Sequence, residues 1–178
     1  MGHVDHGKTT LLDAIRGTNV QSCEVGGITQ NTRAHNIVFN KQPITFIDTP
    51  GHEAFSGMRS RGAKVTDIAL IVVAADDGMK PQTRESIKFA QEEKVPMIVV
   101  ANKIDLPTCD IAKLKNELSQ NNVLVEEYGG ETQFFEVSAK NGTGLDDLLE
   151  GILVQAEIFG VEKIKEQIWK RICSGFGI

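Results

Sequence analysis

The segment Gly2-His3-Val4-Asp5-His6-Gly7-Lys8-Thr9 follows the spacing G-x-x-x-x-G-K-[ST] and starts one residue after Met1. In a loop of this kind, backbone N–H groups surround phosphates, the lysine reaches the β and γ oxygens, and the hydroxyl of Thr9 can bind magnesium. A helix-forming run begins at Lys8, and the N-terminus of a helix favours phosphate through its dipole. The segment therefore predicts a nucleoside triphosphate site, and a glycine-rich turn without a ligand is the weaker interpretation.

The 178 residues carry a net charge of −5 and have a pI near 5.4. This acidic balance argues against autonomous nucleic-acid binding, which depends on basic side chains that neutralise phosphates. Cys23, Cys109 and Cys173 show neither CxxC pairing nor a disulfide pattern, so a reducing compartment fits best. No apolar run reaches the roughly 18 residues of a membrane span. We expect a monomer without membrane contact, in the cytoplasm or, alternatively, in an organellar matrix or stroma.

Short apolar runs, rich in β-branched and aromatic residues, alternate with helical patterns along the chain. The runs predict strands at His35–Phe39, Ile44–Asp48, Ile68–Ala75, Pro96–Ala101 and Phe134–Val137. The patterns predict helices at Lys8–Arg16, His52–Ala63, Gln82–Glu93, Asp110–Gln120 and Leu145–Phe159. This alternation indicates an α/β fold of the P-loop NTPase type, with a mostly parallel sheet covered by helices on both faces. The turn residues Asn40-Lys41-Gln42-Pro43 predict a hairpin that adds one antiparallel edge strand.

Polar residues follow the predicted strand Ile44–Asp48. Asp48 stands at the carboxyl end of the strand, where ligands of open α/β sheets bind, so it is a candidate acid beside magnesium. Gly51 would let its N–H approach a γ-phosphate because no side chain blocks its backbone. His52 is a candidate for positioning water, although a histidine beside a turn is more often a surface or capping residue.

The segment Asn102-Lys103-Ile104-Asp105 follows the buried strand Pro96–Ala101 at the same end of the sheet. The carboxylate of Asp105 can accept hydrogen bonds from N1–H and the 2-amino group of guanine, whereas adenine has no donors at those places. The segment therefore favours GTP over ATP. A polar turn that uses Asn and Asp for backbone reasons would also explain these four residues taken alone.

The phosphate loop is followed in order by Gly26-Gly27-Ile28-Thr29, Asp48-Thr49-Pro50-Gly51-His52, Asn102-Lys103-Ile104-Asp105 and Ser138-Ala139-Lys140. This is the order of the five sequence elements of regulatory GTPases. Over about residues 1–158 the chain resembles the GTPase domain of bacterial-type translation initiation factor two. The resemblance is carried by GHVDHGKTTLLD, EVGGITQ, FIDTPGHEAF, RGAKVTDIALIVVAADDGMKPQT and the acidic stretch EEYGGET. Other translation factors share the first and third elements, whereas GGITQ and YGGET point to this family.

The resemblance implies residue roles. It implies nucleotide contacts for Asp5, His6, Gly7, Lys8, Thr9, Thr10, Gly51, Asn102, Lys103, Asp105, Ser138, Ala139 and Lys140. It also implies magnesium binding by Thr9, Thr29 and, through water, Asp48, while His52 orients the attacking water. By the same analogy, Asp5 helps to hold a monovalent cation near the phosphates.

The implied activity is hydrolysis of GTP to GDP with Mg²⁺, slow in isolation and stimulated by the ribosome. Through its parent protein, such a domain would promote placement of initiator tRNA and joining of ribosomal subunits, with the tRNA contacted by domains absent from this chain. The alternatives are a guanine-nucleotide-binding module without turnover and an inactive fragment. An ATPase with the same loop is the weakest alternative because Asn102 and Asp105 oppose it.

The sequence departs from these relatives at three places. They carry an apolar strand before the phosphate loop, in the interior of the sheet, where this chain has only Met1 before Gly2. We therefore expect two strands without ladder partners, a gap between the helical layers, and a chain truncated at both ends. Asn31-Thr32-Arg33 stands where relatives carry a His-Ile-Gly run. Residues 1–159 form the expected GTP-binding domain, and 160–178 form a tail outside the resemblance, with an amphipathic helix at Val161–Ile172.

Overall fold

The computed structural model describes residues 1–17, 33–49 and 66–160. The elements in chain order are η1 (Val4–His6), α1 (Lys8–Arg16), β1 (Arg33–Phe39), β2 (Gln42–Asp48), β3 (Ala69–Ala74), α3 (Pro81–Glu92), β4 (Met97–Asn102), α4 (Ile111–Gln120), η5 (Glu126–Tyr128), β5 (Gln133–Glu136) and α5 (Leu145–Ile158). The predicted helices His52–Ala63 and Val161–Ile172 lie outside the described residues. No helix in the described ranges is long and apolar enough to cross a membrane.

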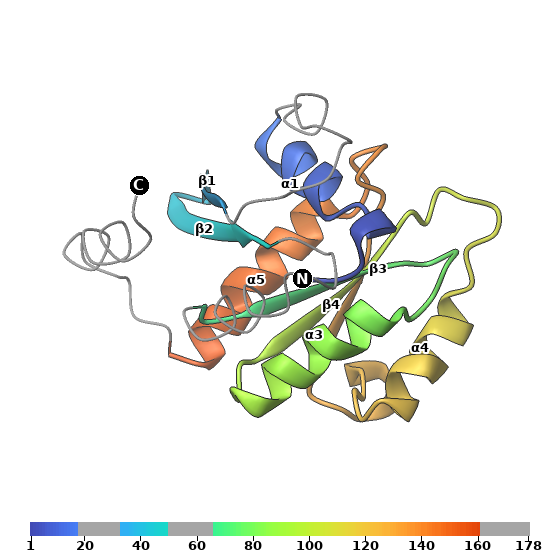
Figure 1. Ribbon diagram of the computed structural model, residues 1–178. Helices are drawn as coiled ribbons and strands as arrows, with labels where there is room; N and C mark the ends of the chain where they lie inside the picture. Colours follow the sequence, from blue (N-terminus) through green and yellow to red (C-terminus); the bar gives the residue numbers. More distant parts are fainter. Residues whose placement is uncertain (18–32, 50–65, 161–178) are drawn as a thin grey trace.

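Strands β3, β4 and β5 form a parallel sheet in which Ile71 pairs with Val99 and Val99 pairs with Phe134. Helices α3 and α4 lie on one face of this sheet, and α1 and α5 lie on the other (Figure 1). The helices explain why β3 and β4 are almost continuously apolar, since strands covered on both faces have no solvent side. The prediction of an α/β fold with a mostly parallel sheet and one antiparallel pair is confirmed.

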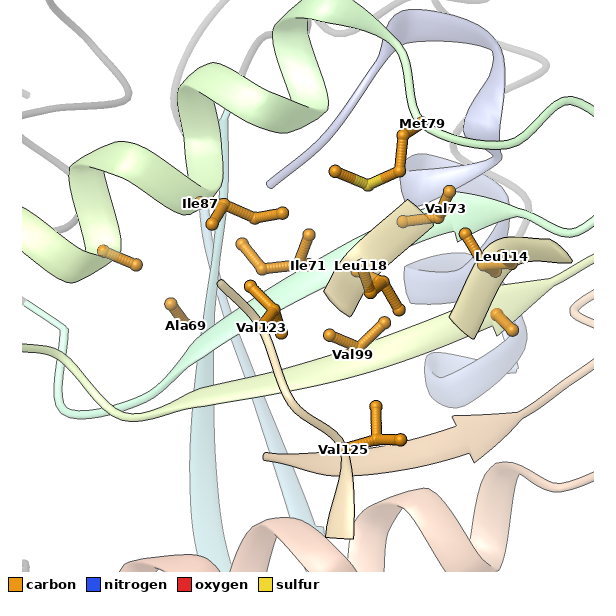
Figure 2. Close-up of a cluster of buried hydrophobic side chains, with 12 residues drawn as sticks. Ala69, Ile71, Val73, Met79, Ile87, Val99, Leu114, Leu118, Val123 and Val125 are labelled. Atoms are coloured by element: carbon orange, nitrogen blue, oxygen red, sulfur yellow. The ribbon is translucent and has the colours of Figure 1, made fainter. Parts of the chain in front are cut away.

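The core consists of two clusters, one on each face of the sheet. Ile71 and Val73 point from β3 toward α3 and α4, where Ile87 and Leu118 meet them (Figure 2). The intervening Val72 belongs to the opposite cluster, with residues of α1 and α5. This alternation follows from the two-residue period of a strand, which places successive side chains on opposite faces.

Strands β1 and β2 form a separate antiparallel hairpin. The turn is shorter than predicted, because Gln42 and Pro43 already belong to β2 and only two residues connect the strands. Those residues, Asn40 and Lys41, have φ angles of 48° and 65°. Two successive positive φ angles are typical of the two-residue turn whose twist matches that of paired strands, which explains the tighter connection.

The expected gap in the sheet lies between β2 and β3, and Met1 is hydrogen-bonded to β3. Within the described residues, β2 pairs with β1 and β3 pairs with β4, while β2 and β3 share no ladder. The α-amino group of Met1 donates to Leu70 O at 2.6 Å, and Val72 N donates to Met1 O at 2.9 Å. This pattern is a parallel bridge opposite Ile71. Met1 thus leads from the sheet directly into the phosphate loop.

Candidate nucleotide-binding site

The phosphate loop wraps around the N-terminus of α1. After the short helix η1, Gly7 takes a left-handed conformation with φ 77°, and α1 begins at Lys8. Gly7 is the N-cap residue of α1 and has no side chain that could cap the helix. The first N–H groups of a helix have no partner within the helix, so these donors suit an anion in the loop.

Lys8 folds back over the loop. Its ammonium donates to His3 O at 2.5 Å, and the side chain is buried. Burying the aliphatic stem while the ammonium is hydrogen-bonded fixes the position of the charge. The loop therefore holds a cation beside the N-terminus of α1, and the contact of Lys8 with phosphate oxygens stays a prediction.

Asn102 connects the phosphate loop with the segment that follows β5. Its Nδ2 donates to His6 O at 3.0 Å, and its Oδ1 accepts from Ala139 N at 3.1 Å. The side chain is fully buried, and a Cβ on Gly7 would lie only 2.6 Å from this Nδ2. The loop can approach Asn102 this closely because residue 7 has no side chain. Through these two contacts Asn102 is a structural joint that connects the phosphate loop with the segment after β5. The sequence did not predict this role.

Asp105 and Ser138 form the other part of the predicted base site. The Ser138 hydroxyl donates to Asp105 Oδ1 at 2.7 Å and also accepts from Asn141 N at 3.2 Å. The hydrogen bond from Ser138 is the main reason that the pKa of Asp105 lies below its usual value. The exposed carboxylate is therefore ionised at neutral pH and keeps acceptor capacity for a ligand.

Thr9 and Asp48 meet at the predicted metal side of the loop, where the Thr9 hydroxyl donates to Asp48 Oδ2 at 3.3 Å. One hydroxyl and one carboxylate suit Mg²⁺, which prefers oxygen ligands and usually combines a few protein groups with phosphates and water. These two residues, together with the cradle at Gly7, fit a magnesium nucleotide. Thr29, Gly51 and His52 lie outside the described residues.

His6 was predicted to contact nucleotide, but its ring is fully buried against β3. Nδ1 lies 3.3 Å from Val72 O, and Nε2 lies 3.7 Å from Asp77 Oδ2. Asp77 in turn pairs with Lys80 at 2.6 Å. The ring thus fastens the loop to β3 and the turn after it, and a contact of His6 with nucleotide stays a prediction. Asp77 and Lys80 were not singled out from the sequence, although their position after β3 was a signal.

Burial lowers the pKa of His6 to about 4. Because the unfolded chain binds this proton near pH 6.5, the free energy of unfolding should fall as the pH drops from 6.5 to about 4. The loss should reach on the order of 3 kcal/mol, since each pKa unit corresponds to about 1.4 kcal/mol. Denaturant unfolding of the wild type and of His6→Gln at several pH values measures this loss of unfolding free energy. Parallel pH profiles for the two proteins would contradict its assignment to His6. Burial also lowers the pKa of His3, so part of the acid loss should persist in the variant.

Asn102→Ala should be strongly destabilising. It would leave His6 O and Ala139 N without their partner, and a buried unpaired group costs about 1–3 kcal/mol. Urea unfolding should therefore show a loss of several kcal/mol, together with weaker nucleotide binding. Asn36→Ala is a matched control, since the Asn36 side chain accepts an exposed hydrogen bond from the Thr45 hydroxyl at 2.9 Å. Equal losses for both variants would contradict the role of Asn102.

The remaining predicted contact residues lie around the loop and the base site. Asp5 is 77% exposed, and its carboxylate lies 3.8 Å from the ring of His3. Thr10 is in the first turn of α1, Lys103 has φ 64°, and Lys140 is exposed. The structure thus brings together, at the carboxyl ends of the strands, the phosphate loop, Asp48, Asn102, Asp105 and Ser138–Lys140. The monovalent cation at Asp5 stays a prediction.

Fold and site together define a P-loop nucleotide-binding protein of the α/β class. Residues 1–157 match the elongation factor Tu GTP binding domain, so the chain belongs to this family of GTP-binding domains of translational GTPases.

Solved structures agree with this assignment. The bacterial selenocysteine-specific elongation factor EF-Sec is 28% identical with a TM-score of 0.71, and 88% of this chain and 28% of that chain are covered. Elongation factor SelB from Methanococcus maripaludis, in complex with the GTP analogue GppNHp, is 29% identical with a TM-score of 0.70, covering 88% and 32%. GDP-bound aIF5B from Aeropyrum pernix is 31% identical with a TM-score of 0.68, covering 88% and 35%. The chain thus spans about a third of the length of these proteins.

Proposed function

We propose that this chain is a GTP-hydrolysing switch domain of a translation initiation factor of the bacterial factor-two type. The observation that carries the proposal is the joint at Asn102, which connects the phosphate loop to the Ser138–Asp105 pair. A phosphate cradle and a carboxylate suited to guanine thereby become one site. The Tyr-Gly-Gly-Glu-Thr stretch and the similarity to aIF5B support the initiation-factor type.

Each part of the site has a chemical task in this proposal. The Lys8 ammonium balances negative charge on the β and γ phosphates, and bound Mg²⁺ would supply further charge neutralisation. Thr9 and Asp48 would hold that ion, with Thr29 as a further ligand. Asp105 would accept hydrogen bonds from guanine, and Ser138 orients its carboxylate. Little covalent chemistry falls to the protein, because phosphoryl transfer depends mainly on positioning and electrostatics.

Calorimetric titration with GDP and, separately, ADP in millimolar Mg²⁺ tests the nucleotide assignment. GDP should bind with at least 100-fold higher affinity than ADP, since a site that hydrogen-bonds specific donors strongly rejects a base that lacks them. Chelating Mg²⁺ should weaken the binding of GTP because Thr9 and Asp48 would lose the ion between them. Equal affinities for GDP and ADP would overturn the choice of guanine.

The proposed role of His52 predicts a selective loss of turnover. His52→Ala should leave GDP affinity unchanged and reduce ribosome-stimulated GTP hydrolysis by roughly 100-fold or more, since general-base or water-positioning groups contribute about 10²–10⁴-fold. Release of phosphate in a single turnover, with and without ribosomes, measures the effect. His35→Ala removes another histidine, on the edge strand β1, and is the control. Absence of phosphate release by the wild type over hours with ribosomes would instead favour a binding module without turnover.

The ribosome is the proposed partner, because the similar proteins are translation factors. Placement of initiator tRNA and joining of subunits are proposed for the parent protein, because this chain spans about a third of the length of the similar proteins. Sedimentation of the chain with ribosomes in GTP and in GDP tests the partner. Preferential sedimentation in GTP is the expected result, and equal sedimentation in both would oppose a nucleotide-dependent switch.

A further inference from the structure

Helix α4 holds the turn that follows β3 (residues 75–80). Met79 N donates to Glu117 Oε2 on α4 at 2.8 Å. Gly78 lies beside the same carboxylate with φ 72°, and a Cβ on Gly78 would lie only 2.8 Å from Glu117 Oε2. The carboxylate can reach the turn because residue 78 has no side chain. Gly78 and Glu117 thus form one fitted contact between two distant segments of the chain.

The hydrogen bond to Glu117 fixes the second half of this turn. Asp77 N and Gly78 N both donate to Ala74 O, at 3.2 Å and 3.0 Å, whereas the next N–H group, on Met79, is directed to α4. Met79 is buried in the cluster on the α3 and α4 face (Figure 2). A buried N–H group needs an acceptor, and a carboxylate forms a stronger hydrogen bond than a neutral oxygen. Without Glu117, the turn would lose the acceptor that places Met79.

The same turn encloses the ring of His6 from the phosphate loop. Asp77 Oδ2 lies 3.7 Å from His6 Nε2, and Val72 O lies 3.3 Å from Nδ1. Lys80 Nζ holds the Asp77 carboxylate at 2.6 Å. The ring is fully buried, and a side chain packed at the density of a protein interior moves only when its surroundings move. The position of the turn therefore limits the motion of the phosphate loop.

We propose that Glu117 is a positioning residue of the nucleotide site. Through Met79 it holds the turn against which His6 is buried, and the phosphate loop thereby keeps the shape that receives phosphate. Glu117 contacts no nucleotide in this role and acts only through the loop. A preorganised loop raises affinity, because less ordering is needed when the ligand binds. The effect on affinity rests on the binding of GDP proposed above, whereas the effect on the loop does not.

Hydrogen exchange of the nucleotide-free chain tests the link between α4 and the phosphate loop. Glu117→Ala removes the acceptor for Met79 N, so exchange should become about 5-fold faster or more in residues 75–80 and in residues 4–8. Exchange in β4 and β5 should stay as in the wild type, because their ladder is not touched. Faster exchange in every element would indicate a general loss of stability, and faster exchange in the turn alone would separate the turn from the loop. Either result would overturn the proposal.

Glu117→Gln is the rescuing variant. Its amide oxygen can still accept from Met79 N, so exchange in residues 4–8 should return to within about 2-fold of the wild-type rate. Exchange as fast as in Glu117→Ala would show that this hydrogen bond does not hold the loop.

Glu127→Ala is the matched control for a general loosening of α4. Glu127 Oε2 on η5 lies 2.6 Å from Lys115 Nζ on α4, so this variant also removes a carboxylate that contacts the helix. It should leave exchange in residues 4–8 unchanged. Acceleration equal to that in Glu117→Ala would mean that any loosening of α4 is sufficient, which would overturn the assignment to Glu117.

Nucleotide titration gives the second readout. Glu117→Ala should lower the affinity for GDP roughly 10-fold, as expected for the loss of one hydrogen bond to a charged group, and Glu117→Gln should restore it. The preference for GDP over ADP should persist, because Asp105 and Ser138 are not touched. Equal GDP affinity of the wild type and Glu117→Ala would overturn the proposal. Absence of GDP binding by the wild type would instead overturn the proposed function, and the exchange experiment would then decide the role of Glu117.

Discussion

Asp105→Asn should lower the affinity for GDP by roughly 100-fold or more. It should also create measurable affinity for xanthosine diphosphate (XDP). The carboxylate of Asp105 is an acceptor with no donor of its own, and guanine presents two donors, N1–H and the 2-amino group. An amide at this position accepts one hydrogen bond but opposes the second donor with its own N–H groups. Xanthine carries an oxygen in place of the 2-amino group, so its acceptor meets the new donor.

Competition calorimetry with GDP, XDP and ADP measures this change. The Ser138 hydroxyl can donate to the oxygen of the new amide as it does to Asp105 Oδ1, so the fold should be retained. Asp147→Asn is the matched control, because Asp147 is an exposed carboxylate in the first turn of α5. Unchanged GDP affinity in Asp105→Asn would remove this residue from the base site, whatever the behaviour of XDP.

Gly7→Ala should nearly abolish nucleotide binding and lower the free energy of unfolding by about 2–4 kcal/mol. Residue 7 has φ 77°, and a left-handed conformation costs a residue with a Cβ about 1–2 kcal/mol. In addition, the new Cβ would lie 2.6 Å from Asn102 Nδ2. That amide cannot retreat freely, because it is hydrogen-bonded to His6 O at 3.0 Å and Ala139 N at 3.1 Å.

Gly17→Ala separates the cost of the left-handed backbone from the cost of the contact with Asn102. Gly17 ends α1 with φ 63°, and a Cβ there would meet no atom of the described residues within 4 Å. This variant should therefore lose only about 1–2 kcal/mol and should bind GDP normally. Urea unfolding and GDP titration of both variants test the argument, and equal GDP affinities would show that the contact between Gly7 and Asn102 does not shape the loop.

Helices could be located from local signals in the sequence. The bounds of α1 were predicted as Lys8–Arg16 and are confirmed, because the phosphate-loop lysine begins it and the left-handed Gly17 ends it. Helix α4 begins one residue later than predicted, since the carboxylate of Asp110 caps it by accepting from Lys113 N at 2.8 Å. Such signals lie within a few residues of the boundary they specify.

Contacts between distant segments could not be predicted in the same way. The contact of Asn102 with guanine stays a prediction, and the structure adds that its amide joins His6, 96 positions away, to Ala139, 37 positions away. No local pattern links these three residues, because their meeting depends on the packing of the whole sheet. The burial of His6 is a similar case, since a motif gives a spacing and not the direction of a ring.

The gap in the sheet was expected from the resemblance, whereas the bridge formed by Met1 was not. The resemblance indicated that an interior strand precedes the phosphate loop in relatives. It gave no information about how the first residue would pair. The backbone groups of Leu70 and Val72 are obligatory hydrogen-bonding groups, and this requirement explains why Met1 pairs with them.

The separation of the hairpin from the parallel sheet has a consequence for the lifetime of a bound nucleotide. Asp48 belongs to the β1–β2 hairpin, while Thr9 belongs to α1, and their side chains meet at 3.3 Å. A small excursion of the hairpin would part these two residues without breaking any hydrogen bond of the β3–β5 ladders. The dissociation rate of a magnesium nucleotide should therefore follow the motion of the hairpin, and variants that destabilise the parallel sheet should change it little.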